Sequence, residues 1–148
     1  MAKQFSIPAL ALSALMATGI STQVLAHGDV TPQGVNTEGL TPLGEEWADT
    51  NPYRKPSDDF ERAAEIGASA YNQNCARCHG LEGISGGIAP DLRLLTPDFD
   101  GDEWYKYRVI NGAVRDGKVY MPKMADYLSQ EALWAIKTYL DVRHDEME

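Results

Sequence analysis

The sequence predicts an all-α domain, and three observations support this fold class. Two stretches, 57–72 and 129–143, place apolar side chains at the three- and four-residue spacing of one helix face, and each begins with a serine that can cap a helix. The segments between them are dense in glycine and proline, which favours irregular loops. No stretch of the sequence has a convincing strand pattern. The domain is therefore expected to consist of helices joined by irregular segments.

The first 26 residues have the layout of a cleavable secretory signal. Lys3 precedes a mostly apolar stretch, 5–20, and small residues then lead to Ala26. An uncleaved membrane anchor fits less well, because polar and helix-breaking residues interrupt the stretch and because it is shorter than the roughly 20 residues that span a bilayer. A lipid anchor is not indicated, because no cysteine lies near Ala26. We expect cleavage after Ala26, a periplasmic location, no stable membrane insertion and a mature chain of 122 residues, enough for one domain.

The composition is acidic. The 148 residues include 22 Asp or Glu and 13 Lys or Arg, a formal net charge of −9 at pH 7, which becomes −10 when the leader and its single lysine are removed. The negative electrostatic field of such a chain disfavours nucleic acid and anionic membrane surfaces as partners. It favours a protein partner with a neutral or basic docking patch.

Residues 27–56 are expected to form an ordered but irregular arm. Prolines and glycines occur too often here for a helix or a strand, yet apolar residues are spread through the segment, so it does not have the composition of a disordered tail. Trp47 and Tyr53 are the expected anchors of the arm on the rest of the protein. The domain proper then comprises residues 57–148.

Three helices are predicted in this domain. The first covers 57–72, and Ser57 with the two acids after it suits a helix start. The second covers 102–111 and stops at Gly112, and the last covers 129–143. The residues expected on their inward stripes are Phe60, Ala64, Gly67, Tyr71, Trp104, Tyr107, Ile110, Leu133, Ile136 and Leu140.

The most informative motif is Cys75-Ala76-Arg77-Cys78-His79, because a Cys-x-x-Cys-His run is the pattern to which haem is covalently attached. Two thiols three positions apart project from one turn, so each can form a thioether with one of the two vinyl groups of a haem, and His79 then faces the iron. The glycine-rich loop 80–90 that follows suits a segment that passes close to a flat cofactor.

Other uses of the two cysteines fit less well. A zinc site needs more ligands, but the chain has no other cysteine, and the remaining histidines, His27 and His144, lie near the ends of the mature chain. A thioredoxin-like dithiol requires a preceding strand, and none is predicted before Cys75. A disulfide between Cys75 and Cys78 would close only a very small loop and would stabilise the chain little.

A methionine is the expected second axial ligand of the iron, because a thioether opposite a histidine is usual on an electron-transfer iron. Met121 precedes a proline, which restricts it to an extended backbone and allows a loop to hold the sulfur. Met124 is the alternative. The sequence favours Met121 and leaves Met124 open.

The mature chain resembles the class I cytochromes c in four motifs: a Gly-x-x-x-aromatic helix before the haem motif, a Pro-x-Leu turn, a Met-Pro ligand loop and a C-terminal helix. The matching residues are Gly67 with Tyr71, Pro90-Asp91-Leu92, Met121-Pro122, and Ile136 with Tyr139. The resemblance implies one covalent haem c, a crossing of the first and last helices at Gly67, and a hydrogen bond from the His79 ring to the Pro90 carbonyl. It also implies that Pro90 and Leu92 belong to the haem-binding residues.

Four flanking runs narrow the resemblance to the soluble periplasmic cytochromes that accept electrons from PQQ-dependent alcohol dehydrogenases, of the cytochrome c-550 and cytochrome c-L types. These runs are Asn51-Pro52-Tyr53-Arg54, Tyr71-Asn72-Gln73-Asn74, 85–92 and 134–140. One departure is that the ethanol-dehydrogenase acceptor type carries a longer segment with additional cysteine after its Asp-Leu turn, whereas 94–102 is short here and has none.

The expected function is therefore that of a mobile, monomeric one-electron carrier and not of an enzyme. The resemblance implies a PQQ-dependent dehydrogenase as electron donor and a cytochrome oxidase or another cytochrome as acceptor. The alternative is a haem enzyme or a gas or redox sensor, which requires a sixth coordination position that opens. Its candidate distal donors, Arg93, Arg108 and Arg115, fit better as surface groups or propionate partners. Copper binding by an N-terminal His27 fits poorly, because no second histidine is expected nearby.

Overall fold

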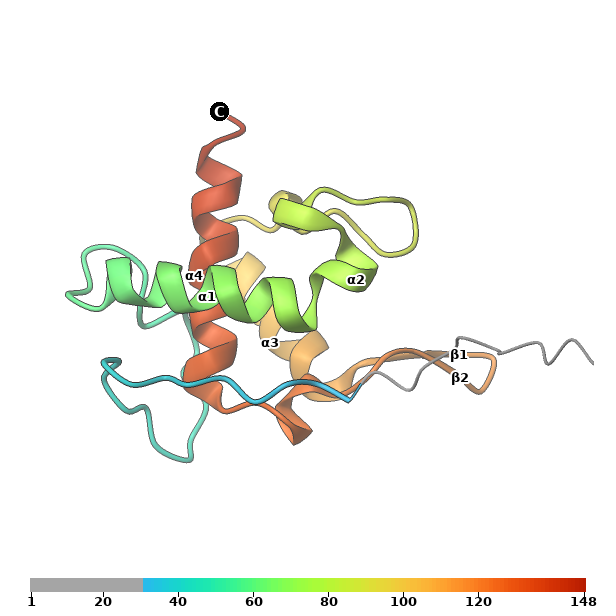
Figure 1. Ribbon diagram of the computed structural model, residues 1–148, viewed down its shortest axis with the longest axis horizontal. Coiled ribbons are helices and arrows are strands. Elements are labelled where there is room, and N and C mark those ends of the chain that lie inside the picture. The colour runs from blue at the N-terminus through green and yellow to red at the C-terminus, as the bar shows by residue number, and fades with distance from the viewer. Residues whose placement is uncertain (1–30) are drawn as a thin grey trace, which may run out of the picture. The chain divides into compact units, whose positions relative to one another are not determined.

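The computed structural model describes residues 31–148, which form helices and one small hairpin (Figure 1). The α-helices in these residues are α1 (Phe60–Asn74), α2 (Ala76–His79), α3 (Phe99–Asn111) and α4 (Gln130–Asp145). Short 3₁₀ turns cover Leu81–Gly83, Leu92–Leu94 and Met124–Asp126, and strands β1 (Ala113–Arg115) and β2 (Lys118–Met121) pair antiparallel. The predicted all-α class is confirmed, with the hairpin added.

The leader predicted over 1–26, and His27 after it, lie outside the described residues. Across residues 31–148, no helix combines the length and the apolar character that crossing a bilayer requires.

Helices α1 and α4 cross near their middles (Figure 1). At the crossing, Gly67 of α1 lies against the backbone of α4, because a Cβ built on Gly67 would stand 1.9 Å from the Ala135 carbonyl oxygen. One turn further along α1, the Tyr71 ring packs against the Tyr139 ring with 5.4 Å between centroids. The crossing expected at Gly67 is confirmed, and the absence of a side chain there permits it.

Two predicted helix starts are wrong by three residues. Helix α1 begins at Phe60 rather than at Ser57, because Ser57 forms a turn in which its hydroxyl accepts from the Asp59 N–H at 3.2 Å. Helix α3 begins at Phe99 rather than at residue 102, because the Asp98 carboxylate accepts from the Gly101 N–H at 2.9 Å and caps the helix earlier.

Helix α3 also buries a different stripe from the predicted one. Its buried residues include Asp102, Tyr105 and Val109, whereas Trp104 and Tyr107 are 52% and 53% exposed and stack on each other. The prediction placed Trp104 and Tyr107 inward and did not include Asp102 in the stripe. The structure buries Asp102 instead, because cations in the interior neutralise its carboxylate.

Residues 31–56 contain no helix or strand, and they pack against α4. The Ala48 N–H donates to the Gln130 side chain at 2.8 Å. Tyr53 is 1% exposed and donates its hydroxyl to a backbone carbonyl of the same segment at 2.7 Å. Trp47 is half-buried and meets the Trp134 ring edge-on. Both aromatic residues expected to anchor this segment therefore contact the core.

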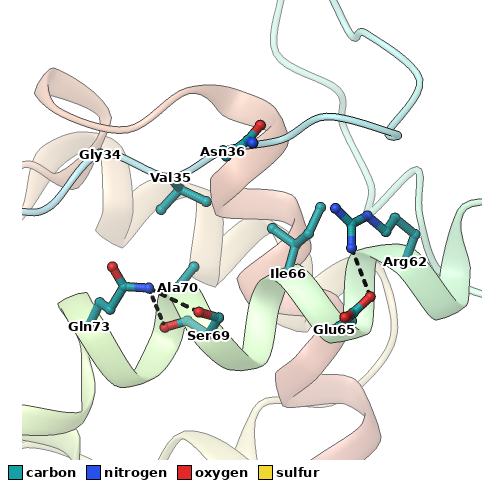
Figure 2. A pocket seen from close by; sticks show the side chains of 9 residues that line it. All are labelled: Gly34, Val35, Asn36, Arg62, Glu65, Ile66, Ser69, Ala70 and Gln73. Carbon is teal, nitrogen blue, oxygen red and sulfur yellow. Dashed lines mark hydrogen bonds and ion pairs between the residues drawn. The ribbon is translucent and has the colours of Figure 1, made fainter.

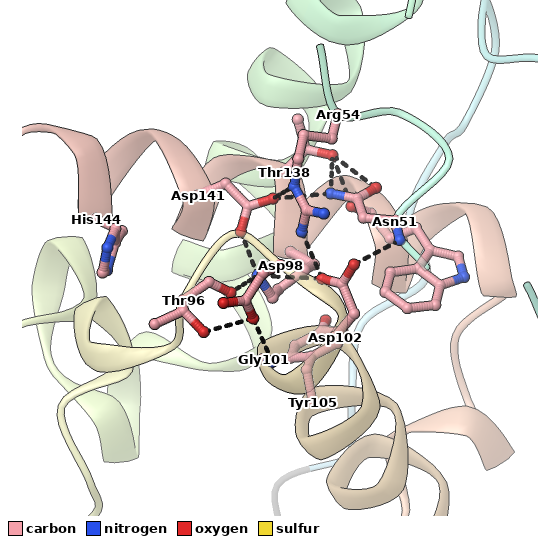
Figure 3. Close-up of polar contacts among 12 residues, drawn as sticks. Asn51, Arg54, Thr96, Asp98, Gly101, Asp102, Tyr105, Thr138, Asp141 and His144 are labelled. Atoms are coloured by element: carbon pink, nitrogen blue, oxygen red, sulfur yellow. Dashed lines mark hydrogen bonds and ion pairs between the residues drawn. The ribbon is translucent and has the colours of Figure 1, made fainter. Parts of the chain in front are cut away.

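A buried ion-pair network joins this segment to α3 and α4 (Figure 3). The Lys137 ammonium group is fully buried and contacts the carboxylates of Asp102, at 3.3 Å, and Asp141. The Arg54 guanidinium lies 2.5 and 2.9 Å from the same two carboxylates. The Asn51 side-chain amide donates to Asp141 at 3.1 Å. The two cations balance the two acids, and none of these residues belongs to the predicted haem site.

Candidate cofactor site

The Cys-x-x-Cys-His motif lies at the joint between α1 and the single turn of α2. The Cys75 N–H donates to the Tyr71 carbonyl at 2.8 Å and continues the last turn of α1, and the His79 N–H donates to the Cys75 carbonyl at 3.0 Å. Cys75 is half-buried and Cys78 is exposed, and no disulfide joins them. Their positions on one helical turn fit two attachment points on one edge of a haem.

The environment of Cys75 does not suit a redox dithiol. Burial, with a smaller contribution from Cys78, raises the pKa of the Cys75 thiol to about 12. Thioredoxin-like chemistry depends instead on a thiol with a lowered pKa. Within residues 31–148, no three His, Cys, Asp or Glu side chains are grouped so that they could hold a metal ion. The attachment of haem remains the use that fits both thiols.

His79 is oriented by the turn that follows it. Its Nδ1 lies 2.9 Å from the Pro90 carbonyl oxygen, which is the contact that the sequence resemblance implies. Because a carbonyl oxygen only accepts, Nδ1 carries the hydrogen, and in the neutral imidazole the lone pair is then on Nε2. This neutral tautomer is the form in which an imidazole binds iron, so His79 fits an axial ligand of a haem.

The loop between His79 and Pro90 is tied to α1. Gly80 has a φ of +82°, and a Cβ built on it would stand 1.9 Å from the Ile84 carbonyl oxygen. The Tyr71 hydroxyl donates to the Gly80 carbonyl at 2.7 Å. Helix α1, whose middle packs on α4, therefore also holds the start of this loop through Tyr71. The loop ends at Pro90, whose carbonyl contacts His79.

Asp91 fixes the turn that carries this acceptor. Its carboxylate accepts from the Arg93 side chain at 2.7 and 3.0 Å, and from the N–H groups of Arg93, at 3.0 Å, and Ser85, at 3.3 Å. The hydrogen bonds from the Arg93 side chain, supported by those N–H groups, lower the pKa of Asp91 to about 2. Leu92 follows in this turn and packs against the hydrophobic core.

We expect Asp91→Asn to destabilise the protein at neutral pH and to have little effect near pH 2. Because the folded-state pKa is depressed, the ionised carboxylate stabilises the fold above the unfolded-state value of 3.8, and this stabilisation is lost as the pH falls through about 2. Chemical denaturation of both forms between about pH 2 and pH 7 measures it. Glu45→Gln, at an exposed loop position, is the control. A difference that stayed constant across this range would contradict the expectation.

Met121 and Met124 occupy different environments. Met124 is 5% exposed and belongs to the hydrophobic core. Met121 ends strand β2, is half-buried and packs against the edge of that core. Gly112 lies close to its backbone, because a Cβ built on Gly112 would stand 2.5 Å from the Met121 carbonyl oxygen. A glycine is therefore needed where the chain passes the predicted ligand.

The structure brings most of the predicted site residues to one core. Cys75, Leu92 and Met121 pack against the same hydrophobic cluster, and His79 contacts Pro90. Cys78 is exposed. The predicted site thus draws on the end of α1, the single turn of α2, the turn after the glycine-rich loop and the end of β2.

Sequence reasoning missed the hairpin that leads to Met121. Positive φ values at Asp116, 49°, and Gly117, 73°, form the two-residue primed turn that suits the twist of a hairpin. The Asp-Gly pair was the available signal. Strands of three and four residues were too short for an alternating pattern to be recognised.

A separate surface cavity of about 300 Å³ lies between residues 34–36 and α1 (Figure 2). Its lining comprises Gly34, Val35, Asn36, Arg62, Glu65, Ile66, Ser69, Ala70 and Gln73. None of these residues belongs to the predicted haem site.

Comparison with known proteins places the chain among cytochromes. Residues 62–140 match the family model described as "Cytochrome C oxidase, cbb3-type, subunit III". The chain is 69% identical to cytochrome c550 of Pseudomonas aeruginosa over 133 residues, which cover 90% of this chain and 92% of that protein.

Two further similarities are confined to part of the chain. It is 40% identical over 82 residues to the quinohemoprotein alcohol dehydrogenase ADH-IIG of Pseudomonas putida, a match that covers 55% of this chain and 11% of the enzyme. It is 35% identical over 77 residues to chloroplastic cytochrome c6 of Chlamydomonas reinhardtii, covering 51% of each. No solved structure gave a match.

Proposed function

Because this chain belongs to the class I cytochrome c family and is a haem c electron carrier, we propose that His79 and Met121 ligate its iron and that it works as a periplasmic monomer. When bound, the haem supplies a one-electron Fe(III)/Fe(II) couple. The chain would hold it through Cys75 and Cys78, which would provide the two thioether attachments, and through His79 and Met121, which would ligate the iron. No substrate bond is made or broken at such a site.

The contact between His79 and Pro90 is the observation that carries this proposal. It fixes the imidazole in the tautomer whose Nε2 is free to bind iron, and it restricts rotation of the ring. The acceptor carbonyl is itself held by the turn in which Asp91 binds Arg93. A ligand held this firmly suits electron transfer, since little has to move when the charge on the iron changes.

Met121 is supported as the second ligand by the place that Met124 occupies. Met124 fills the core at 5% exposure, so using its sulfur as a ligand would leave a cavity there. Met121 instead stands at the end of β2, next to Pro122 and close to Gly112, where the backbone is constrained. A thioether binds iron weakly, so a constrained backbone helps, because little conformational entropy is then lost when the thioether binds.

The ligand assignment is tested with three variants of the periplasmic holoprotein. In Met121→Ala we expect loss of the weak red methionine-to-iron absorption band of the oxidised form. In Met124→Ala the band should remain, but the free energy of unfolding should fall by about 2–5 kcal/mol because a core side chain is truncated. Met124→Leu is the matched control and should keep the band with a loss below about 1.5 kcal/mol. Loss of the band in Met124→Leu and not in Met121→Ala would reverse the assignment.

We propose that the donor is a PQQ-dependent alcohol dehydrogenase and that the acceptor is a cytochrome oxidase or another cytochrome. The similarity to the quinohemoprotein alcohol dehydrogenase supports this, because by its name that enzyme contains a quinone and a haem. To test the pairing, the oxidised holoprotein is rapidly mixed with a purified dehydrogenase and its alcohol, and reduction of the haem is measured. If the haem stayed oxidised, the donor would have to be another protein, while the carrier function would stand.

The periplasmic location is proposed from the leader pattern of residues 1–26. Cell fractionation and N-terminal sequencing of the exported holoprotein test it. We expect a periplasmic protein that begins at His27, whereas retention of Met1 or recovery in the cytoplasm would contradict the proposal.

A further inference from the structure

The chain is acidic as a whole, but the segment around Met121 is basic. Between Glu103 and Asp126 the sequence contains five Lys or Arg residues and one acid, Asp116. Ion pairs neutralise many of the cations elsewhere in the described residues. The Lys and Arg side chains of residues 31–148 that form no ion pair are Lys55, Arg77, Arg108, Arg115, Lys118 and Lys123. Four of these six lie between residues 108 and 123.

The β1–β2 hairpin presents two chemically different faces. Val114 pairs with Val119, and Arg115 pairs with Lys118. Because alternate residues of a strand point to opposite faces, Tyr120 lies on the face of Lys118. The Arg115 guanidinium accordingly lies over the Tyr120 ring, 5.7 Å from its centroid. One face therefore carries valines, and the other carries two cations and an aromatic ring.

The cationic face is exposed and lies on the strand that ends at the proposed ligand. Arg115, Lys118 and Tyr120 are all exposed. The primed turn at Asp116-Gly117 fixes the hairpin, which extends from the helices on the side away from the start of α1 (Figure 1). The strand that carries Lys118 ends at Met121. By the same alternation the Met121 side chain lies on the valine face, so a partner on the cationic face would contact the strand that carries the proposed ligand from its opposite side.

We propose that the Arg115–Lys118–Tyr120 face of the hairpin docks a redox protein whose own contact patch is acidic. This proposal rests on the proposed function, since it places the contact on the strand that carries the Met121 ligand. The net charge of the whole chain favours a neutral or basic partner. At about 0.1 M ionic strength, however, charges more than about 10 Å from the contact are largely screened, so the local cations decide the sign of the interaction. Complementary charge then accelerates a brief encounter.

The sign of the local field is tested with ferricyanide as an anionic oxidant of the reduced holoprotein. The second-order rate constant should fall as the ionic strength rises from about 0.1 to 1 M, as for an attractive interaction, although the protein is acidic overall. Lys118→Glu should lower the rate constant at about 0.1 M by roughly threefold to fivefold. The matched control is Lys55→Glu, which changes the net charge equally near the start of α1, where Lys55 lies over the Phe60 ring. It should change the rate by less than about 1.5-fold.

A second readout does not depend on electron transfer. Hexacyanocobaltate(III), a redox-inert anion of the same charge as ferricyanide, should shift the amide resonances of residues 115–123 in the wild type and not in Lys118→Glu. Equal effects of Lys118→Glu and Lys55→Glu on the rate, or a rate that rises with salt in the wild type, would overturn the docking proposal. Absence of the methionine-to-iron band from the wild type would instead refute the Met121 ligand, so the two failures are distinguishable.

Discussion

Replacing Lys137 with methionine is expected to lower the free energy of unfolding of the holoprotein by about 3–5 kcal/mol at neutral pH. Lys137 has no exposed surface, and its ammonium group contacts two buried carboxylates and the Thr96 carbonyl, at 3.1 Å. Methionine fits the same space but carries no charge. Asp102 and Asp141 would then share Arg54 alone, which leaves one uncompensated negative charge in the interior. Denaturant unfolding at pH 7 measures the loss.

The same substitution at Lys106 provides the control. Lys106 also pairs with an aspartate, at 3.1 Å, but that partner, Asp49, is 88% exposed. Water solvates Asp49 when the lysine is removed, so Lys106→Met should cost less than about 1 kcal/mol. Asp102→Asn combined with Lys137→Met removes one charge of each sign and should recover part of the loss. If Lys137→Met and Lys106→Met lowered the free energy of unfolding equally, burial would not determine how much the network contributes to stability.

This network was not predicted from the sequence, because charged side chains are usually assigned to the surface. The pattern nevertheless held a signal. Lys137 stands four residues after Leu133 and three before Leu140, so it shares their inward stripe, and Asp141 follows it at the spacing of an intrahelical pair. Asp102 is likewise three residues before the buried Tyr105. A charged residue within an apolar stripe, with an oppositely charged residue one turn away, indicates a buried ion pair. It does not mean that the stripe was wrongly assigned.

The placement of two thiols and a histidine on one turn could be predicted because it depends only on the short spacing of the motif. The contact between His79 and the Pro90 carbonyl was instead implied by the resemblance to the class I cytochromes c. Met121 required a choice between two nearby sulfurs, and the sequence could not show that Met124 lies in the core. Which face of α3 is buried was harder still, since it depends on Arg54 and Lys137 from two other segments.

Gly67→Ala is expected to lower the free energy of unfolding by about 3 kcal/mol, although the same change in an open helix stabilises by roughly 0.5–1 kcal/mol. The added Cβ would stand 1.9 Å from the Ala135 carbonyl oxygen and 2.5 Å from its carbon, so α1 and α4 would have to move apart. Thermal and denaturant unfolding of the holoprotein measure the effect. Gly34→Ala, at a glycine with no atom within 4 Å of the added Cβ, is the control and should be neutral or slightly stabilising.

The position of the closest atoms makes this prediction specific. The Cβ would meet main-chain atoms of Ala135, whereas the nearest side-chain atom, Cβ of Tyr139, lies at 3.0 Å. A backbone carbonyl within a helix cannot move without disturbing its own hydrogen bonds, so trimming a neighbouring side chain offers no relief. Tyr139→Gly, which removes that Cβ, should therefore fail to rescue Gly67→Ala and should add its own losses of helix propensity and of ring packing against Tyr71. Recovery of wild-type stability in the double variant would instead mean that the side chain of Tyr139, and not the α4 backbone, requires glycine at the crossing.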